Sequence, residues 1–420
     1  MKFHITLFVL FLYIRSWAQV GLPHYIDEAL KNSPVVVEQS NLSQLSELEI
    51  ERIKKELKGP TVFATADYLM APYFNNKKFI DTNPDPNAIG YDAGITNGGL
   101  YSALLNVSQP FLTTKTLKAY QSVQNIEQSK YAYSNELVKR ELKRSVTQQY
   151  IVVYRDQLLI EANENLLNVI EDQASATHQL AKSGIVKQSD VLLVDLEKKS
   201  QQSVLNLLKG KKQSDLSTLN ATCGLSDTSR VTVKTPVLTT EEAGNTGSFL
   251  RLYQLDSLSV EANTNVFASR YRPQMSLLAN AGLNAVSLEN IQNKFGFSVG
   301  VGVSLSIYDG HQKDINRQKA EVLKSSIAAY KKRKSLDVRN NIQKYINVIS
   351  TLTDNIQTLE DQQNKYDILL KQYKVEVKSG QLSYINYITS LRYYRELKIK
   401  LINAQIDRML AQNELNYWNW

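Results

Sequence analysis

Proline and glycine are missing from long stretches of this 420-residue chain. Nine prolines are present, but residues 111–235 and 274–420 contain none. Up to position 209 in the first stretch, and beyond position 310 in the second, the only glycines are Gly184 and Gly380. Because helix interiors exclude both residue types, the two stretches predict two long helical hairpins, each turning at a single glycine.

Residues that could form a catalytic or metal site are also scarce. A single cysteine, Cys223, excludes an intrachain disulfide and a cysteine-based metal cluster. The four histidines lie far apart, with no second ligand at metal-binding spacing. The glycines of 296–302 alternate within a strand-like pattern and do not form a phosphate-binding loop. No pair of carboxylates stands out as a general acid and base. We therefore expect no enzymatic activity, no cofactor and no bound metal.

Charge of one sign is only mildly in excess. The formal net charge is +8, and it falls to +6 without Lys2 and Arg15 of the leader described next. The basic run 331–334 is interpreted as a solvated helix face rather than a nucleic-acid patch. We predict no nucleic-acid partner.

The first 18 residues have the pattern of a secretory signal peptide. Lys2 precedes an apolar run over 5–14, and Ser16 and Ala18 supply the small residues of a cleavage site. The alternative is a buried N-terminal helix. No later segment offers 18 consecutive apolar residues, so a membrane-embedded form of this chain would have to use strands.

The remaining chain is a tandem duplication. A shift of 196 residues places the segment 100–220 on 296–416 without a gap, and residues 182–184 fall on 378–380, Lys-Ser-Gly in both. Upstream, Pro60 and Pro273 match at a shift of 213. The first half therefore carries 17 extra residues in its Asn-, Asp-, Gly- and Pro-rich segment, which predicts an exposed loop.

Each half contains two runs with a period of two. From Phe295 to Ile307, apolar residues alternate strictly with Gly and Ser, and 101–108 is the equivalent run in the first half. Partner runs follow Pro60 and Pro273, which predicts two hairpins over about 60–110 and 273–307. One apolar and one small polar face are typical of a transmembrane barrel, and a soluble β-sandwich edge is the alternative. In the barrel reading, the lipid-facing residues are Leu105, Val107, Val299, Val301 and Val303.

After each second strand the period becomes helical. A heptad-like seam extends over more than five repeats in the second half. Its members are Val338, Ile342, Tyr345, Ile349, Leu352, Ile356, Leu359, Tyr366, Leu370, Tyr373 and Val377. The predicted hairpins span about 112–220 and 311–420. A single hairpin of this length has a narrow core, so we expect an oligomer.

Five motifs carry a resemblance to a known family. They are IDEALKNSP at 26–34, SQPFLT at 108–113, GIVKQSDVL at 184–192, SIYDG at 306–310 and GQLSYINYI at 380–388. Together with the duplication, they resemble the opening helix, the strand-to-helix junctions and the hairpin tips of the TolC-like outer membrane efflux protein (outer membrane factor) family. The resemblance covers about residues 24–420.

The resemblance implies a fold, a location and partners. The fold would be mixed α and β: a homotrimer whose protomers each give four strands to one 12-stranded transmembrane β-barrel. A long periplasmic α-helical coiled-coil barrel would continue it and dock on an inner-membrane pump through a periplasmic adaptor (membrane fusion) protein. The location would be the outer membrane, in contact with its lipid.

The domain layout follows from the duplication and the resemblance. Residues 1–18 form the signal peptide, and 19–220 the first repeat, with a helix, a β-hairpin and a helical hairpin whose tip lies near 184. Residues 221–248 form an equatorial linker. Residues 249–420 form the second repeat, with its tip near 380.

The hairpin tips are the candidate functional site. Gly184, Asp190, Gly380 and Asn386 are assigned to the pore mouth and to adaptor docking, and Asp190 would place one carboxylate per protomer near that mouth. The alternative for both glycines is that they only cap a helix and turn the chain.

The second tip departs from the family pattern. Several members close the pore with a tyrosine, an arginine and aspartates, whereas the matching positions here are Val377, Leu382, Asn386 and Thr389. The function implied is a passive outer membrane exit duct of a tripartite efflux or type I secretion system. The alternative is a periplasmic coiled-coil scaffold or adaptor without its own pore, although an adaptor would normally have one hairpin flanked by β-domains.

Overall fold

The structure is a computed structural model. It describes residues 21–69, 101–111, 113–226, 231–239, 247–285, 288, 290–379 and 381–420. The expected signal peptide, the expected exposed loop in the first half and Gly380 lie outside these described residues.

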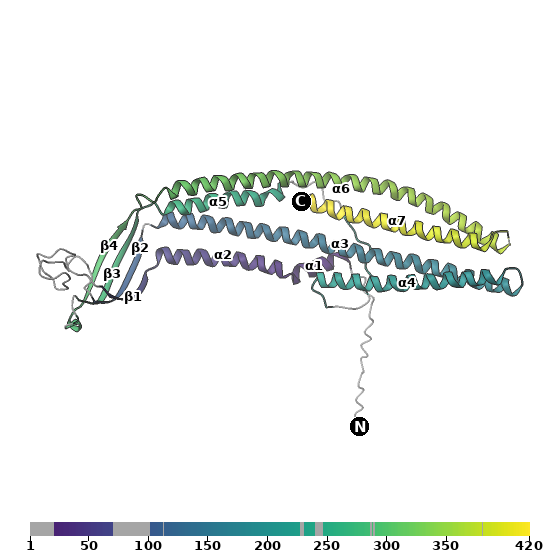
Figure 1. The fold of residues 1–420 in the computed structure, drawn as a ribbon, viewed down its shortest axis with the longest axis horizontal. Helices are drawn as coiled ribbons and strands as arrows, with labels where there is room; N and C mark the ends of the chain where they lie inside the picture. Colours follow the sequence, from purple (N-terminus) through teal and green to yellow (C-terminus); the bar gives the residue numbers. More distant parts are fainter. Residues whose placement is uncertain are drawn as a thin grey trace, which may run out of the picture. The chain divides into compact units, whose positions relative to one another are not determined.

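The described chain is mostly helical, with one small antiparallel sheet (Figure 1). The helices and strands occur in the order α1 (Leu22–Asn32), α2 (Pro34–Lys58), β1 (Thr61–Tyr68), β2 (Tyr101–Phe111), α3 (Thr114–Lys182), α4 (Gln188–Thr222), α5 (Arg251–Ser269), β3 (Gln274–Ala285), β4 (Phe295–Ser304), α6 (Gln312–Lys378) and α7 (Tyr384–Trp418). Short 3-10 turns cover Ser248–Leu250 and Ile291–Asn293. The expected mixed fold class is confirmed.

The described residues fall into two compact units, each assembled from both halves of the chain. The sheet unit comprises residues 40–133 and 252–331, and the helical unit comprises residues up to 39, 134–251 and 332–420. Helices α3 and α6 each contribute a segment to both units. The two units are described separately below.

The sheet has the strand order β1-β2-β3-β4, and its register divides it into two chemically distinct faces. Val299 is opposite Ala279, which is opposite Val107, which is opposite Val62. Because side chains of opposed residues lie on the same face of a sheet, the apolar positions of all four strands line up. The alternation predicted from the sequence is confirmed in β4, and on this face it is interrupted by Gln109 of β2.

The other face is mostly small and polar. Its large apolar exceptions are Phe63, Leu104 and Leu278. Asn106 Nδ2 donates to Thr65 Oγ1 at 2.9 Å, and Ser298 Oγ donates to Asn280 Oδ1 at 2.9 Å. These cross-strand pairs satisfy polar groups on neighbouring strands.

Gly282 is required by the close approach of β2 and β3. Its φ is +153°, and a Cβ at this position would lie 2.1 Å from the backbone oxygen of Ala103. By contrast, a Cβ at Gly300 on the same face would meet no atom within 4 Å. Only the first of these glycines is therefore fixed by backbone packing.

Strand β4 is shorter than predicted. It ends at Ser304, so Leu305 and Ile307 lie beyond the strand. Gln274 pairs with Ser304, and the preceding residue, Pro273, has no N–H to continue the ladder. The proline that marks the start of the hairpin therefore also sets where its second strand stops pairing.

Every helix connection of the sheet unit is at the same end of the sheet. Helix α2 leads into β1, β2 leads into α3, α5 leads into β3, and β4 leads into α6. Because neighbouring strands are antiparallel, these four junctions share one end. Strands β1 and β3 end, and β2 and β4 begin, at the other end of the sheet.

The helical unit contains two antiparallel helical hairpins, α3–α4 and α6–α7 (Figure 1). Helices α4 and α7 begin and end 196 residues apart, which matches the duplication found in the sequence. The predicted seam of the second hairpin is confirmed, since Val338, Ile356, Leu359 and Val377 are buried and the other members are half-buried. In the described part of the chain, no helix combines the length and the apolar character needed to cross a membrane.

Helix α1 and a short connector complete one core of the helical unit. Leu22, Tyr25 and Ala29 of α1 pack with Tyr150 of α3 and with Val233. The Tyr150 hydroxyl donates to the backbone oxygen of Lys234 at 2.7 Å. The extended segment around Val233 therefore lies against α3 as part of the core.

Candidate functional site at the hairpin tips

The first tip is a glycine-terminated helix followed by a new helix. Gly184 has φ +73°, its N–H donates to Ala181 O at 3.0 Å, and the N–H of Ile185 donates to Leu180 O at 2.9 Å. This pair of bonds is a Schellman motif, which favours glycine because the conformation is left-handed. A Cβ at Gly184 would meet no atom within 4 Å, so conformation alone selects the glycine.

Asp190 has a structural role at the start of α4. Its Oδ2 accepts a hydrogen bond from the backbone N–H of Lys187 at 3.3 Å, and its side chain lies in the first turn of the helix. A carboxylate there complements the partial positive charge of the helix N-terminus. The residue is half-buried, so the carboxylate retains contact with solvent at the tip.

The second tip is described on the α7 side only, because Gly380 lies outside the described residues. Asn386 is exposed in the first turn of α7, and its backbone N–H donates to Ser383 O at 3.1 Å. No hydrogen bond or ion pair among the described residues joins Asn386 to Asp190. The candidate tip residues are thus separate surface groups.

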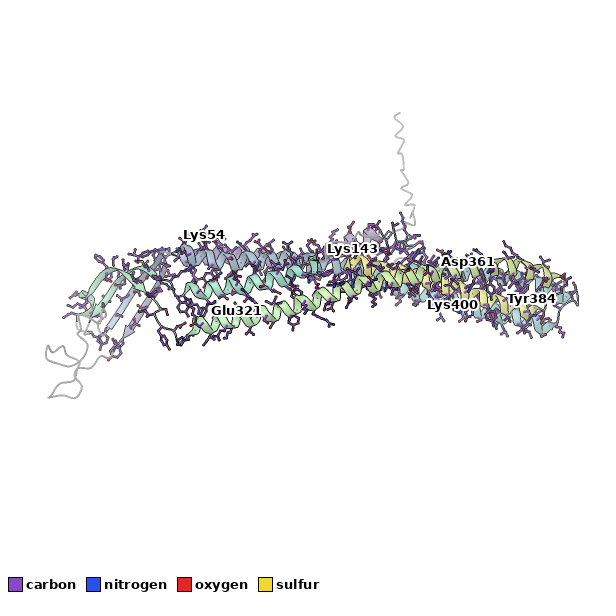
Figure 2. All side chains as sticks on the ribbon, turned by 90° about the horizontal axis from the view of Figure 1, so that it is seen from above. Lys54, Lys143, Glu321, Asp361, Tyr384 and Lys400 are labelled. Carbon is purple, nitrogen blue, oxygen red and sulfur yellow. The ribbon has the colours of Figure 1, made fainter. Side chains whose placement is uncertain are left out.

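An apolar cluster joins the two tips. Leu166 and Ile170 of α3 and Val194 of α4 pack with Tyr384 and Tyr387 of the second hairpin. The two tyrosine rings lie edge to face with centroids 6.3 Å apart, and Figure 2 shows Tyr384 near the α6–α7 turn. Both tyrosines are buried and keep a neutral phenol, since burial raises the pKa of each to about 12.

Two of the four positions matched from the sequence to the family's closing residues belong to this cluster. Val377 is buried in it and Leu382 packs against it, whereas Asn386 and Thr389 are exposed. The part of the second tip that contains Val377 and Leu382 is therefore held together by packing rather than by charged groups.

A buried polar network, which sequence reasoning missed, links the two hairpins further along. Arg392 of α7 donates to Glu197 Oε2 of α4 at 2.6 and 3.0 Å, and Arg395 donates to Gln201 Oε1 at 3.2 Å. Gln201 Nε2 in turn donates to Asn163 Oδ1 of α3 at 2.7 Å. The Glu197 side chain is only 6% exposed, so its charge depends on these partners. The hydrogen bond to Glu197 raises the pKa of Arg392.

The sequence held one signal for this network. Glu197 and Gln201 are four residues apart on one face of α4, and Arg392 and Arg395 are three apart on α7. Such spacing is equally typical of solvated helix faces, so the pairing of two distant helices could not be inferred from it.

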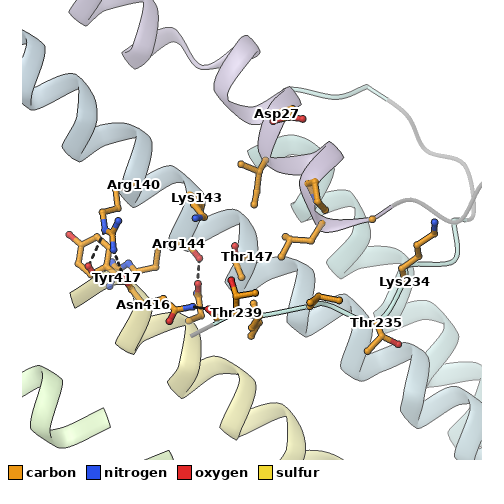
Figure 3. A pocket seen from close by; sticks show the side chains of 17 residues that line it. Asp27, Arg140, Lys143, Arg144, Thr147, Lys234, Thr235, Thr239, Asn416 and Tyr417 are labelled. Carbon is orange, nitrogen blue, oxygen red and sulfur yellow. Dashed lines mark hydrogen bonds between the residues drawn. The ribbon is translucent and has the colours of Figure 1, made fainter. Parts of the chain in front are cut away.

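A hollow of the helical unit lies beside the end of α7 (Figure 3) and encloses about 410 Å³. Arg140 of α3 donates to the backbone oxygens of Asn416 and Tyr417, and Arg144 forms an ion pair with Glu414 at 3.1 Å. Both guanidinium groups therefore bind groups near the C-terminal end of α7, where a cation interacts favourably with the helix dipole. Among the described residues, no group of three or more histidines, cysteines and acids is arranged to hold a metal ion.

The barrel residues named from the sequence all lie on the apolar face of the sheet. Val299, Val301 and Val303 on β4 are each at least 60% exposed, and Leu105 on β2 is 53% exposed. Val107 is half-buried on the same face. A soluble sheet rarely leaves such a continuous apolar face uncovered.

Comparison with known proteins agrees on the fold. No family model matches the sequence, and no curated protein matches it. Among solved structures, the outer membrane protein VceC from Vibrio cholerae has a TM-score of 0.71 at 14% identity, covering 95% of each chain. CusC has a TM-score of 0.73 at 13% identity, covering 96% of this chain and 92% of its own. The open-state MtrE outer membrane channel of Neisseria gonorrhoeae has a TM-score of 0.71 at 12% identity, covering 95% and 88%. The chain therefore has the fold of TolC-like outer membrane channels, as the motifs predicted.

Proposed function

We propose that this protein is a passive exit duct of the outer membrane, in which three copies close one barrel of twelve strands. The observation that carries the proposal is the sheet, which is almost wholly apolar on one face and predominantly small and polar on the other. In a barrel, the apolar face contacts lipid and the polar face lines a water-filled lumen. The duct performs no chemistry of its own.

The two open edges of the sheet support an oligomer. Strands β1 and β4 are each paired on one side only. In a bilayer every unpaired backbone N–H and C=O is costly, so the edges must meet other strands. Copies of the same sheet, joined β4 to β1, satisfy them by a closed ring.

The helical unit supports the same conclusion. Ile346, Ile368 and Val375 on α6 and Leu196 and Leu207 on α4 are exposed apolar side chains, between 45% and 73% accessible. Neighbouring copies would cover such residues and form a helical tunnel on the periplasmic side.

The hairpin tips are proposed to contact the periplasmic adaptor. Gly184, Gly380, Asp190 and Asn386 are proposed to form the pore mouth, where a periplasmic adaptor connects the duct to an inner-membrane pump of an efflux or secretion system. Bulky replacements at Gly184 should impair export and leave the protein in the outer membrane. The alternative function, a periplasmic scaffold or adaptor without a pore, leaves the uncovered apolar face of the sheet without a role.

The first experiment tests the direction of the faces. Arginine at Val299 should cost about 2–4 kcal/mol if the residue lies near the bilayer midplane, and arginine at the neighbouring Ser298 much less. Trimer yield in the outer membrane fraction measures both. Equal tolerance of the two substitutions would refute the barrel assignment.

A second experiment tests the topology of the duct. Residues 75–98 are proposed to lie outside the cell, so a label or protease added to intact cells should reach a tag inserted there. Access from the periplasm alone would show that the orientation is inverted.

A third experiment tests the pore mouth. Asp190→Asn retains a side-chain acceptor for the Lys187 N–H but removes the charge, so assembly should survive. The reversal potential in a salt gradient should shift toward weaker cation preference, because charges converging on a pore axis attract cations. Asp195→Asn, further along α4, is the matched control. Identical potentials for wild type and Asp190→Asn would remove Asp190 from the narrow part of the channel.

A further inference from the structure

A second hollow of the helical unit lies between α3, α6 and α7. It is a groove of about 350 Å³, which is within the range of small-molecule sites. Helices α6 and α7 supply most of its side chains. The groove is distinct from the tip residues assigned above and from the hollow beside the end of α7.

The floor of the groove is apolar and well packed. Leu166, Tyr387 and Leu391 line it and are 8%, 2% and 4% exposed. All three belong to the apolar cluster that joins the tips. A flat apolar group placed in the groove would therefore contact a rigid surface that is already formed.

The rim of the groove is cationic. Lys371 and Lys374 are three residues apart on α6, are exposed, and form no ion pair with any residue in the described part of the chain. Lys398 reaches the groove from α7, and its Nζ donates to the neutral amide oxygen of Gln363 at 3.1 Å. Three ammonium groups from two helices thus border one apolar floor.

The single acid of the groove is already engaged. Asp367 interacts with the phenol of Tyr394, and burial, with the help of this contact, raises the pKa of Tyr394 to about 12. The phenol therefore stays protonated and keeps the Asp367 carboxylate occupied. Asp367 keeps its negative charge, so the three lysines and one carboxylate give the groove a net charge of +2.

We propose that this groove binds an anionic amphiphile, a small molecule with a flat apolar body and one acidic head group. The apolar floor would hold the body, and Lys371 and Lys374 would hold the head. A cationic molecule of the same shape is disfavoured by the three ammonium groups. The proposed binding site does not depend on the proposed duct function. Only the idea that this ligand class is exported cargo rests on it.

Naphthalene-2-sulfonate is a suitable probe, because it has an aromatic body, one fixed negative charge and good solubility. We expect the purified full-length protein in detergent to bind it in calorimetric titration. Inorganic sulfate and a naphthyl trimethylammonium salt should bind at least tenfold more weakly. Equal binding of sulfate would show that only the charges matter, and equal binding of the cation would show that only the apolar floor matters. Either result would overturn the proposal.

Two variants locate the site. Lys371→Gln/Lys374→Gln should weaken binding of the sulfonate about tenfold or more. Lys365→Gln/Lys400→Gln removes two exposed, unpaired lysines of the same helices outside the groove and should leave binding unchanged. Val169→Trp, which fills the rim from α3 without changing charge, should also abolish binding, with circular dichroism to verify folding. Unchanged binding in both groove variants would overturn the proposal.

Conductance separates this inference from the proposed function. If planar bilayers show channels and the sulfonate does not bind, the groove assignment fails and the duct stands. If the sulfonate binds at the lysines and no channel forms, the duct fails and the groove stands.

Discussion

The seams of the two helical hairpins have opposite chemistry at one heptad position. In α6 this position holds Tyr345, Leu352 and Leu359. The residues 196 positions earlier in α3 are Gln149, Asp156 and Asn163. Duplicated helices of the same fold thus carry an apolar seam in one copy and a polar ladder in the other.

The polar ladder is held by bonds to α4. Gln149 Nε2 donates to Asp215 O at 3.1 Å, and Asn163 Oδ1 accepts from Gln201 at 2.7 Å. Asp156 is fully buried, with Oδ1 paired to Arg155 at 2.8 Å and Oδ2 without a hydrogen-bond donor. Polar residues in a seam reduce stability and restrict register. The polar bonds therefore add a constraint on the register between α3 and α4, whereas this position in the second hairpin relies on apolar packing.

The hairpins also differ in charge. Helices α3 and α4 carry 14 basic and 12 acidic residues, a net of +2, whereas α6 and α7 carry 19 and 11, a net of +8. Duplication preserved the helix lengths and left the surface of the second copy free to become basic. The lysine-bordered groove is part of that difference.

The largest expected effect comes from a comparison of equivalent positions in α3 and α6 that differ in burial. Tyr150 of α3 is fully buried, whereas its counterpart in α6, Ile346, is 45% exposed. Tyr150→Ala should reduce the free energy of unfolding by about 3–5 kcal/mol, because it removes a packed ring and a hydrogen bond. Ile346→Ala should cost about 0.5–1 kcal/mol in the isolated protomer. Denaturant midpoints measure both, and a larger loss at Ile346 than at Tyr150 would break the comparison.

The next effect concerns the link between the hairpins. Arg392 stands where the first repeat has Leu196, so Arg392→Leu installs the repeat's own residue. It should destabilise the protein by about 2 kcal/mol, since it leaves Glu197 buried and poorly paired while Arg392 itself is partly solvated. Adding Glu197→Gln should restore most of the loss. Additive effects of the two substitutions in this double-mutant cycle would argue against the ion pair.

A smaller effect, of opposite sign, is expected at the polar ladder. Burial and the neighbouring Asp215 raise the pKa of Asp156. The folded state therefore binds a proton more readily than the unfolded chain, and this group's contribution to stability falls as pH rises through the folded pKa. Asp156→Leu, the residue found in α6, should stabilise the protein by about 1–2 kcal/mol at pH 7.

The pH dependence distinguishes this explanation from simple packing. The gain in Asp156→Leu should shrink as the pH is lowered, because the raised pKa of Asp156 lets the wild-type carboxyl take up a proton earlier than in the unfolded chain. Leu352→Asp is the reciprocal variant and should destabilise the second hairpin. A gain that is the same at pH 4 and pH 7 would show that the charge of Asp156 is irrelevant.

The smallest effect concerns a cation among aromatic rings. Lys334 Nζ lies 5.0 Å from the ring centre of Phe249 and 4.9 Å from that of Trp418, whereas the first repeat has Val138 at the matching position. Lys334→Gln should cost about 0.5–1 kcal/mol and change tryptophan fluorescence. Lys332→Gln, on the exposed face, is the control. If the two variants have the same stability and the same fluorescence, Lys334 makes no energetically significant contact with the rings.

Periodicity explains which parts of the fold the sequence could reveal. The strands, the seam of α6 and the glycine turn at Gly184 were all predicted, because each depends on local spacing. The polar ladder was not, since Asp156 and Asn163 look like solvated residues until the helix that covers them is known. The link between Glu197 and Arg392 escaped for the same reason, as its partners are 195 residues apart.

The same distinction between local spacing and contacts of distant helices applies to the candidate site. The assignment of Asp190 to a pore mouth stays a prediction, and the structure adds that its carboxylate accepts a hydrogen bond from the Lys187 N–H, which no charge pattern reveals. The groove on α6 and α7 was not anticipated, because its apolar floor and its lysines come from three helices. The predicted end of β4 lies three residues too far along the chain. The apolar alternation continues to Ile307, but pairing with β3 stops at Ser304 because the neighbouring Pro273 has no N–H for the ladder.

The single-ended attachment of helices to the sheet has a consequence for how the surface can evolve. Among the described elements, strands β1 and β3 end, and β2 and β4 begin, at the end of the sheet that no helix joins. In the proposed orientation this end faces the outside of the cell. Substitutions in the strand ends there lie far along the chain from the helices proposed to meet partners. Recognition by the environment and recognition by the export machinery are thereby under separate selection in one polypeptide.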